Sequence, residues 1–453
     1  MAVLGFALLA AAVLALLALV HRYVWRRLVG DTTTAGSLPR RAGTAAAYVL
    51  PLLSVGALVS GRTGTPFWLQ QVLAWPGYLW LAALLYLTLA LLAGELVRPL
   101  LSRLLARRAG GAPEATTGAT PAPEATTGAT PAPEAAAGAT PAPAAETVPA
   151  EPVATAHGST VTTTAPPASA PLAAPAPAAP SRRLFVARAV GGVAAVAGLG
   201  TTGYGAYGVL RGPRVKRVAV PLARLPRSAH GFRIAVVSDI HLGPVLGRAH
   251  TQRIVDAVNR TQPDLIAVVG DLVDGSVENL GPAAEPLAGL RSRHGAFFVT
   301  GNHEYYSGAA EWVDHVRELG LHPLENARVE IDGFDLAGVN DIAGESEGQG
   351  PDFGRALGDR DRTRAAVLMA HQPVVIDEAV EHGVDLQLSG HTHGGQLWPG
   401  NYIAELSNPT VAGLERYGDT QLYVTRGAGA WGPPVRVGAP SDITVVELAS
   451  GQA

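Results

Sequence analysis

Side chains that bind divalent cations recur in five short blocks of the second half of the chain. In chain order the blocks are Asp239-Ile240-His241, Gly270-Asp271-Leu272-Val273-Asp274, Gly301-Asn302-His303-Glu304, His371 and Gly390-His391-Thr392-His393. Imidazole nitrogens and carboxylate oxygens suit Mn, Fe or Zn, and a carboxylate can bridge two ions. Two neighbouring ions clamp the attacking and leaving oxygens of an in-line displacement, with a bridging hydroxide as nucleophile. The blocks therefore indicate metal-assisted displacement chemistry.

Each block follows a short apolar run that is typical of a buried strand. Three such runs are followed by the first three blocks, and helical patterns lie between them near Arg248–Arg260 and Pro282–Arg291. Strands that alternate with helices predict an α/β domain, and ligands of such a domain gather at the carboxyl ends of its strands. We expect the five blocks to converge there. The predicted strands cover residues 233–239, 264–271, 295–302, 335–339, 365–370, 386–389, 421–425 and 443–448.

The ordered blocks D-x-H, GDxxD, GNHE, H and GHTH resemble the calcineurin-like metallophosphoesterase family over about residues 231–450. The resemblance implies a four-layered αββα sandwich that holds two divalent ions, Mn, Fe or Zn. It assigns three ligands to each ion and one bridge: Asp239, His241 and His393 for one ion, Asn302, His371 and His391 for the other, and Asp271 between them.

The same resemblance implies the roles of two further residues. His303 would be the catalytic histidine, which stabilises the phosphoryl charge and protonates the leaving oxygen. Asp274 would orient His303, although an aspartate at this position is also a common turn former.

Aromatic and basic residues beside the blocks suggest a substrate site. The run Asn302–Tyr306 and the loop Gly427–Arg436 resemble the membrane-tethered YaeI/YkuE-type branch of the family, and also the animal transmembrane protein with a metallophosphoesterase domain. Substrate contact and an ordinary structural role both remain open for these side chains. Aromatic residues stack on a substrate or pack in a core, and basic residues bind a second phosphate or headgroup or lie in solvent; the candidates are Tyr305, Tyr306, Trp431, Arg426 and Arg436.

Apolar runs before the catalytic half predict transmembrane helices, because about 20 apolar residues cross a bilayer. They cover Ala2–Val20, Ala45–Ser60, Val72–Gly94 and Leu184–Leu210. The rival for the first run is a cleaved signal peptide, which the absence of a preceding basic region disfavours. Three helices would thus occupy residues 1–108.

The segment between the third and fourth apolar runs has a different composition. Residues 109–181 are rich in Pro, Ala and Thr and contain repeats of a decamer, PAPEATTGAT, which predicts a disordered linker. The residues Ser181-Arg182-Arg183-Leu184-Phe185 then resemble a twin-arginine export signal. Residues 182–212 are accordingly a fourth transmembrane helix or a twin-arginine-like signal anchor that engages the export machinery, and residues 213–453 form the metallophosphoesterase domain.

Arginine distribution predicts the orientation of these helices, because cytoplasmic loops are enriched in Lys and Arg. Five Arg residues lie in or beside the first loop, and only Arg62 lies in the second. The first loop would be cytoplasmic, so the fourth span would lead outward and the catalytic domain would be extracytoplasmic. The basic residues just after that span, at 211–217, argue against this direction.

Charge and cysteine content exclude some functions. Residues 231–453 contain 15 Arg, no Lys and 30 Asp or Glu, a net charge of −15 with histidine neutral. Nucleic-acid binding needs a cationic surface, so a nuclease is disfavoured. The chain has no cysteine, which excludes disulfides and thiolate metal sites.

We therefore expect an integral membrane protein that hydrolyses a phosphate monoester or diester at the membrane surface. The membrane helices make a lipid-linked or headgroup phosphate a candidate substrate. The alternatives are a nuclease and a non-catalytic interaction module with the same fold. All seven ligand positions and the catalytic histidine are filled, which favours the enzyme over the interaction module.

Overall fold

The computed structural model describes residues 2–110 and 181–451. Within these ranges, residues 2–103 and 182–451 belong to one compact unit. The linker predicted at 109–181 lies outside the described residues except at its two ends.

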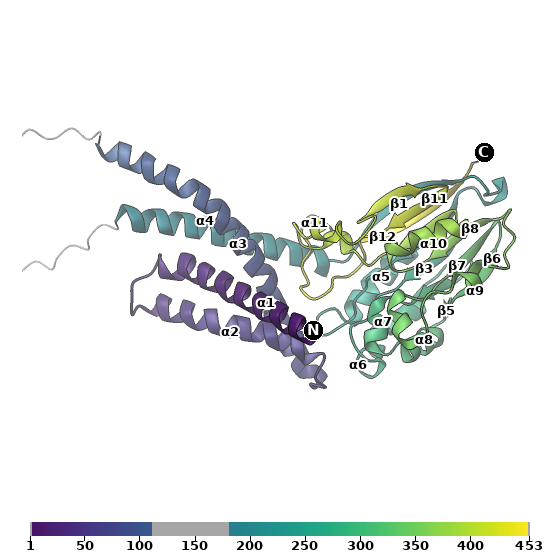
Figure 1. Cartoon of the computed structure of the whole chain (residues 1–453), viewed down its shortest axis with the longest axis horizontal. Coiled ribbons are helices and arrows are strands. Elements are labelled where there is room, and N and C mark those ends of the chain that lie inside the picture. The colour runs from purple at the N-terminus through teal and green to yellow at the C-terminus, as the bar shows by residue number, and fades with distance from the viewer. Residues whose placement is uncertain (1, 111–180, 452–453) are drawn as a thin grey trace, which may run out of the picture. The chain divides into compact units, whose positions relative to one another are not determined.

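The N-terminal half forms a group of long helices (Figure 1), whose bounds are α1 Ala2–Trp25, η1 Arg26–Gly30, α2 Leu38–Ser60, α3 Phe67–Gly110 and α4 Arg182–Leu210. Among the described residues, three helical stretches are long and apolar enough to cross a membrane, namely Leu38–Ser60, Phe67–Arg107 and Arg182–Leu210. They coincide with three of the four predicted spans. Helix α1 covers the first predicted span, which remains a prediction.

The helices pack closely because small residues line their contacts. The Ser54 hydroxyl donates to the Gly77 carbonyl oxygen over 2.8 Å, which joins α2 to α3. A Cβ atom on Gly198 would lie 2.8 Å from the backbone nitrogen of Leu87, so only glycine permits this approach of α4 to α3.

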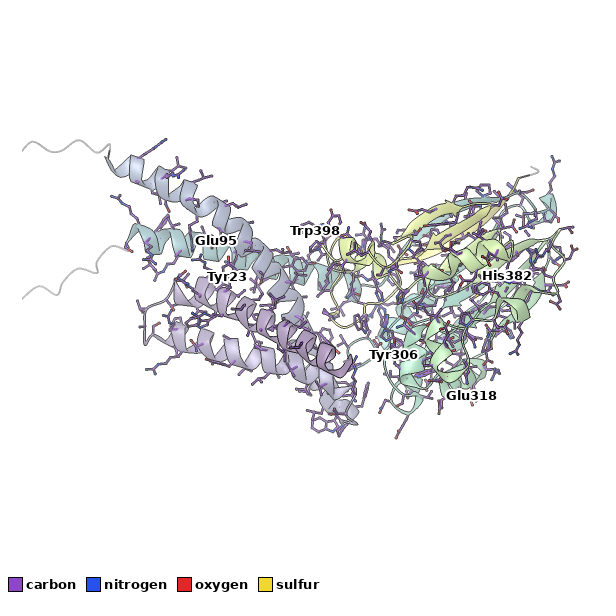
Figure 2. All side chains as sticks on the ribbon, in the orientation of Figure 1. Tyr23, Glu95, Tyr306, Glu318, His382 and Trp398 are labelled. Atoms are coloured by element: carbon purple, nitrogen blue, oxygen red, sulfur yellow. The ribbon has the colours of Figure 1, made fainter. Side chains whose placement is uncertain are left out.

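Polar contacts gather the arginine-rich ends of the helices at one end of the group. The Arg27 guanidinium lies 2.9 Å from the Glu95 carboxylate, and the Tyr23 hydroxyl donates to the same carboxylate over 3.4 Å (Figure 2). From α4, Arg188 donates to the Thr32 carbonyl oxygen over 3.0 Å. The C-terminal end of α1 with η1, the second half of α3 and the N-terminal end of α4 therefore lie together.

Two six-stranded mixed sheets form the catalytic domain. In the first, the strand order is β1-β12-β2-β3-β4-β5, with bounds Arg214–Leu222, Asp442–Ser450, Phe232–Val237, Leu265–Val269, Ala296–Val299 and Leu321–Pro323. In the second, the order is β10-β11-β9-β8-β7-β6, with bounds Gly413–Tyr417, Thr420–Val424, Leu386–Ser389, Ala365–Met369, Phe334–Gly338 and Ala327–Ile331.

Helices lie between the strands along the chain. Their bounds are η2 Arg227–Ala229, α5 Arg248–Arg260, α6 Val277–Ala284, η3 Glu285–Gly289, α7 Asn302–Ser307, α8 Ala309–Glu318, η4 Ile342–Glu347, α9 Phe353–Leu357, η5 Pro373–Val375, α10 Ile376–Glu381, η6 His393–Gly395 and α11 Asn401–Ala404. Several of them, α5, α6, α8, α9 and α10, cover the outer faces of the two sheets. The helix predicted at 282–291 begins earlier, at Val277, and continues as η3.

Three buried clusters define the layers. One cluster combines apolar residues of both sheets, such as Ile234 and Val367, so the sheets face each other. A second packs the first sheet against α5, α6 and α8, with Trp312 fully buried. A third packs the second sheet against α9 and α10. This arrangement confirms the predicted four-layered αββα sandwich.

Candidate metal centre

Every predicted metal ligand follows the carboxyl end of a strand. Strands β2, β3 and β4 run parallel in the first sheet, and β8 and β9 run parallel in the second. Carboxyl ends of parallel strands share one edge of a sheet. The ligands therefore occupy one edge of each sheet: Asp239 after β2, Asp271 after β3, Asn302 after β4, His371 after β8, and His391 and His393 after β9.

Contacts between the sheets bring the two edges together. The backbone N–H of His391, after β9, donates to the Asp239 carboxylate after β2 over 3.0 Å. A Cβ atom on Gly390 would clash with the side chains of Ser238 and Asp239, so glycine is needed at this crossing. The Ser238 hydroxyl also donates to Asp239 over 2.6 Å and fixes its orientation.

Backbone strain is concentrated at the same residues. Among the described non-glycine residues, eight have a positive φ, and five of these are predicted ligands, namely Asp239, His241, Asp271, His391 and His393, with φ between 49° and 72°. Such a conformation is costly for a residue with a Cβ atom and is characteristic of functional sites. The strain therefore marks these loops as candidates for a functional site.

The side chains of these residues converge in two groups, which are linked by a third group of His241, Asp271 and His303. In one group, Asp239, His241 and His393 have ligand atoms within 4.8 Å of one another, and the Nε2 atoms of the two histidines are 3.0 Å apart. In the other, Asp271, His371 and His391 meet the same limit. The grouping agrees with the ligand sets implied by the family resemblance.

The remaining predicted ligand, Asn302, joins the second group through a histidine. Its Oδ1 atom lies 3.0 Å from Nδ1 of His391. The backbone N–H of the next residue, His303, donates to Asp271 over 2.9 Å. The structure therefore brings all seven predicted ligands into one cluster.

His371 carries the strongest indication that the cluster suits a cation. Its Nδ1 atom lies 2.9 Å from the Val269 carbonyl oxygen, which leaves the lone pair of a neutral ring on Nε2. This Nε2 is buried, makes no hydrogen bond, and lies 3.1 Å from the Asp271 carboxylate. A buried nitrogen without a hydrogen bond calls for a specific explanation, and a divalent ion is one that fits the neighbouring carboxylate.

Asp274 contacts two histidines at once. Its Oδ1 atom is 2.6 Å from Nδ1 of His303 and 3.1 Å from Nδ1 of His241. Both contacts use the ring nitrogen that points away from the cluster, so Nε2 of each ring remains available. The predicted partnership with His303 is thus present, and the contact with His241 adds a second one.

Burial and neighbouring charges shift the pKa values of these groups in opposite directions. Burial alone would lower the pKa of His241, but nearby carboxylates, Asp274 first among them, raise it to about 9. Burial and the neighbouring His371 lower the pKa of His391 to about 4. Burial would raise the pKa of Asp274, whereas His241 and His303 bring it to about 2. Opposed shifts of this kind are common at functional sites.

Glu304 organises the cluster although the sequence reasoning gave it no role. Its buried carboxylate accepts hydrogen bonds from the backbone N–H groups of Asp271, Leu272 and Gly301, over 3.0, 2.7 and 2.6 Å. Burial and the charge of Asp271 raise the pKa of Glu304 to about 7. The residue ties the loop after β3 to the loop after β4. The sequence signal for this role was the position of Glu304 in the GNHE block.

Two of the predicted substrate-binding residues lie away from the pocket beside His303. Arg436 is 5 % exposed, and its guanidinium donates to the carbonyl oxygens of Gly429, His393 and Ala439 and lies 3.1 Å from Nδ1 of His393. Tyr305 donates to the Gln349 carbonyl oxygen over 3.3 Å. Both side chains are engaged with protein groups.

Tyr306 and Trp431 flank His303 instead. Their ring centroids lie 5.4 and 5.7 Å from that of His303, in edge-on contacts. Tyr306 (Figure 2) is 73 % exposed, and Trp431 is 54 % exposed. Both line a pocket of about 170 Å³ together with His241, Asp274 and His303. Exposed aromatic surfaces beside His303 are suited to contact a ligand.

Comparisons with known proteins support the family resemblance of the metal-binding blocks. A family model described as calcineurin-like phosphoesterase matches residues 232–395. An uncharacterized metallophosphoesterase from Aquifex aeolicus is 35 % identical over 240 residues, which cover 52 % of this chain and 91 % of the relative.

Two further relatives are informative. A transmembrane protein with metallophosphoesterase domain from Danio rerio is 39 % identical over 259 residues, which cover 54 % of this chain and 59 % of the relative. The chain thus spans less than two thirds of that relative's length. The uncharacterized metallophosphoesterase YkuE from Bacillus subtilis is 28 % identical over 284 residues, which cover 60 % of this chain and 98 % of the relative.

Proposed function

Because the chain belongs to the calcineurin-like metallophosphoesterases, we propose that it hydrolyses a phosphate monoester or diester at a membrane surface with a two-metal centre. Asp239, His241 and His393 would hold one ion, Asn302, His371 and His391 would hold the other, and Asp271 would serve as a ligand to both. When bound, two such ions of Mn, Fe or Zn supply a hydroxide nucleophile and neutralise phosphate charge. The observation that carries the proposal is the convergence of all seven ligands beside His303.

The protein's own groups perform the remaining chemistry. With Nδ1 of His303 held by Asp274, the opposite nitrogen, Nε2, can donate a proton to the departing alkoxide. The same ring, when protonated, stabilises negative charge on the phosphoryl group. Tyr306 and Trp431 shield one side of the pocket and restrict the approach of the ester.

Metal analysis combined with an activity assay tests this proposal. Purified full-length protein supplied with Mn, Fe or Zn should bind about two ions per chain and cleave an aryl phosphomonoester, an aryl phosphodiester or both. Asp271→Asn should lower metal content and activity together, because it removes the bridging charge. Asp256→Asn on the outer helix α5 is the matched control. A metal-loaded wild type that cleaves neither ester would refute the proposal.

Membrane location is the second part of the proposal. Three apolar helices and the transmembrane relative support an integral membrane protein. We place the catalytic domain outside the cytoplasm, with a lipid-linked or headgroup phosphate as substrate and the twin-arginine machinery as the export route through Arg182 and Arg183. The gathered arginine-rich helix ends support a cytoplasmic location for that end.

Protease access in intact cells tests the orientation. An extracytoplasmic domain should be digested when the outer barrier is permeable to protease and the cytoplasmic membrane is intact. Digestion that requires lysis of the cytoplasmic membrane would reverse the orientation without affecting the proposed chemistry.

The alternative functions would give different results in binding and activity assays. A nuclease would require a cationic path for a phosphate backbone, which the net charge of −15 in residues 231–453 disfavours. An assay on single- and double-stranded DNA decides this alternative. A non-catalytic interaction module would bind no metal and cleave neither aryl ester.

A further inference from the structure

The pocket beside His303 has a second wall, and this wall belongs to the membrane helices. On one side lie His241, Asp274 and His303 of the catalytic domain. On the other lie residues of the C-terminal end of α2, the following loop and α3, among them Leu58, Arg62, Gln70 and Tyr78. A side chain about 180 residues earlier in the chain than the first metal ligand therefore borders the active site.

Short-range contacts hold this second wall in place. The Tyr78 hydroxyl of α3 donates to the Ala57 carbonyl oxygen of α2 over 3.3 Å. Phe67, the first residue of α3, packs against the buried cluster that includes Ile254 and Trp312 of the catalytic domain. The loop between α2 and α3 is therefore fixed at both the helix pair and the domain.

Arg62 gives this wall its charge. It is the single Arg or Lys among the described residues that line the pocket, whereas the catalytic domain contributes Asp274 there. Its Nη1 atom donates to the Leu58 carbonyl oxygen over 2.9 Å, and the side chain is exposed, so further N–H donors are free to bind a ligand. An anionic substrate entering an acidic domain would meet this guanidinium at the pocket wall.

The same wall is continuous with an apolar surface. Leu58 lines the pocket and is 45 % exposed, and the outward side chains Leu52 and Val55 of the same helix are 70 % and 51 % exposed. Helix α2 is one of the helices apolar enough to cross a membrane, so these side chains are suited to contact lipid. A ligand that matches both features has an anionic headgroup and an apolar tail.

We propose that the loop between α2 and α3 is part of the substrate site, with Arg62 binding the headgroup of an anionic membrane lipid. The lipid's phosphate ester reaches His303 while its acyl chains remain beside α2. This inference rests on the proposed phosphoesterase function, narrows its substrate to an anionic membrane lipid, and adds a specificity-determining residue from outside the catalytic domain.

Matched lipid and water-soluble esters test the inference. Each lipid is compared with the water-soluble ester that has the same headgroup, using metal-loaded full-length protein. The monoester pair is dioleoyl phosphatidic acid in detergent micelles and glycerol 3-phosphate. The diester pair is phosphatidylglycerol and glycerophosphoglycerol. Wild type should show the lower KM for the lipid of the pair that it hydrolyses. Arg62→Gln should raise the KM for that lipid roughly tenfold, the effect of losing one charge-assisted hydrogen bond, with a smaller change in kcat. Arg62→Lys should recover part of the loss because it restores the charge.

Arg103→Gln is the matched control, because it removes the same charge at the opposite end of α3 and should leave both KM values at the wild-type level. Equal lipid KM values for Arg62→Gln and wild type would overturn the inference. So would a wild type that hydrolyses aryl or water-soluble esters but neither lipid, and in that case the proposed function would stand. A wild type that hydrolyses no ester would remove the proposed function itself.

A photoactivatable phosphatidic acid gives a readout that is independent of turnover. Cross-linking to the metal-free protein should label residues 57–78, and Arg62→Gln should reduce the labelling whereas Arg103→Gln should not. Labelling confined to other membrane segments would overturn the inference.

Discussion

The Oδ1 atom of Asp274 lies 2.6 Å from the Nδ1 atom of His303. The short distance indicates a charge-assisted hydrogen bond that selects one tautomer of the ring and one orientation. In the proposed mechanism this bond holds Nδ1, so that Nε2 is the nitrogen that donates a proton.

Asp274→Asn should therefore lower kcat roughly 10- to 100-fold, the usual effect of losing a carboxylate that orients a catalytic or metal-binding histidine. The amide retains the shape of the side chain but loses its charge, so the fold should persist. Steady-state kinetics on an aryl phosphate, with metal content measured in parallel, provide the test. The same substitution at the exposed Asp377 serves as the control, and equal kcat values for the two variants would contradict the role of Asp274.

The buried strands were predictable because both of their faces are covered. Residues 386–389 coincide with β9, and residues 365–370 extend β8 by one residue. Edge strands such as β1 were not predicted, because its exposed positions carry charged side chains that interrupt the apolar run. Sequence patterns report burial, and an edge strand is buried only in part.

The convergence of the predicted metal ligands was predictable for a related reason, since each one follows a buried strand and belongs to a recognisable block. The pocket wall that the membrane helices form was not predictable from the sequence. Arg62 lines the pocket beside His303 only through the packing of α2 and α3 on the domain, and no local pattern encodes that position. For Arg436 the sequence left substrate binding and a solvated position both open, whereas its guanidinium is buried among carbonyl oxygens. The sequence of a glycine-rich loop does not show whether a single arginine in it points into the protein or toward solvent.

Glu304→Gln should destabilise the protein by roughly 2 kcal/mol. The amide oxygen of the new side chain can still accept the hydrogen bonds from the N–H groups of Asp271 and Gly301. The amide nitrogen would then lie opposite the N–H of Leu272, and two donors cannot form a hydrogen bond with each other. Thermal unfolding in detergent measures the change. Glu318→Gln, at an exposed carboxylate on α8, should unfold at the wild-type temperature; a Glu304→Gln variant that does the same would show that the carboxylate is dispensable.

Arg436→Met should lower both stability and metal content. The substitution leaves three carbonyl oxygens, those of Gly429, His393 and Ala439, without this donor, which should cost about 3 kcal/mol. It also frees the loop that carries His393, so metal should be lost during purification. Metal analysis and thermal unfolding test both effects against Arg416→Met, an exposed control. Retention of the full metal content would show that Arg436 does not position His393.

Gly205 couples the membrane helix α4 to the same loop. Its carbonyl oxygen accepts a hydrogen bond from the Arg436 backbone N–H over 3.3 Å. A Cβ atom on Gly205 would lie 2.9 Å from the Arg436 carbonyl oxygen and 2.6 Å from a methyl group of Val435, so Gly205→Ala must displace the loop. We expect a loss of roughly 1–3 kcal/mol and weaker metal retention.

Gly203→Ala provides the matched comparison, because no atom lies within 4 Å of the corresponding Cβ position. There the better helix propensity of alanine should leave stability unchanged or raise it by up to about 1 kcal/mol. Thermal unfolding and metal content of the two variants, measured side by side in detergent, separate a specific contact from a general effect of replacing helical glycine. If both variants behave alike, α4 does not support the loop, and the metal centre is independent of the membrane helices.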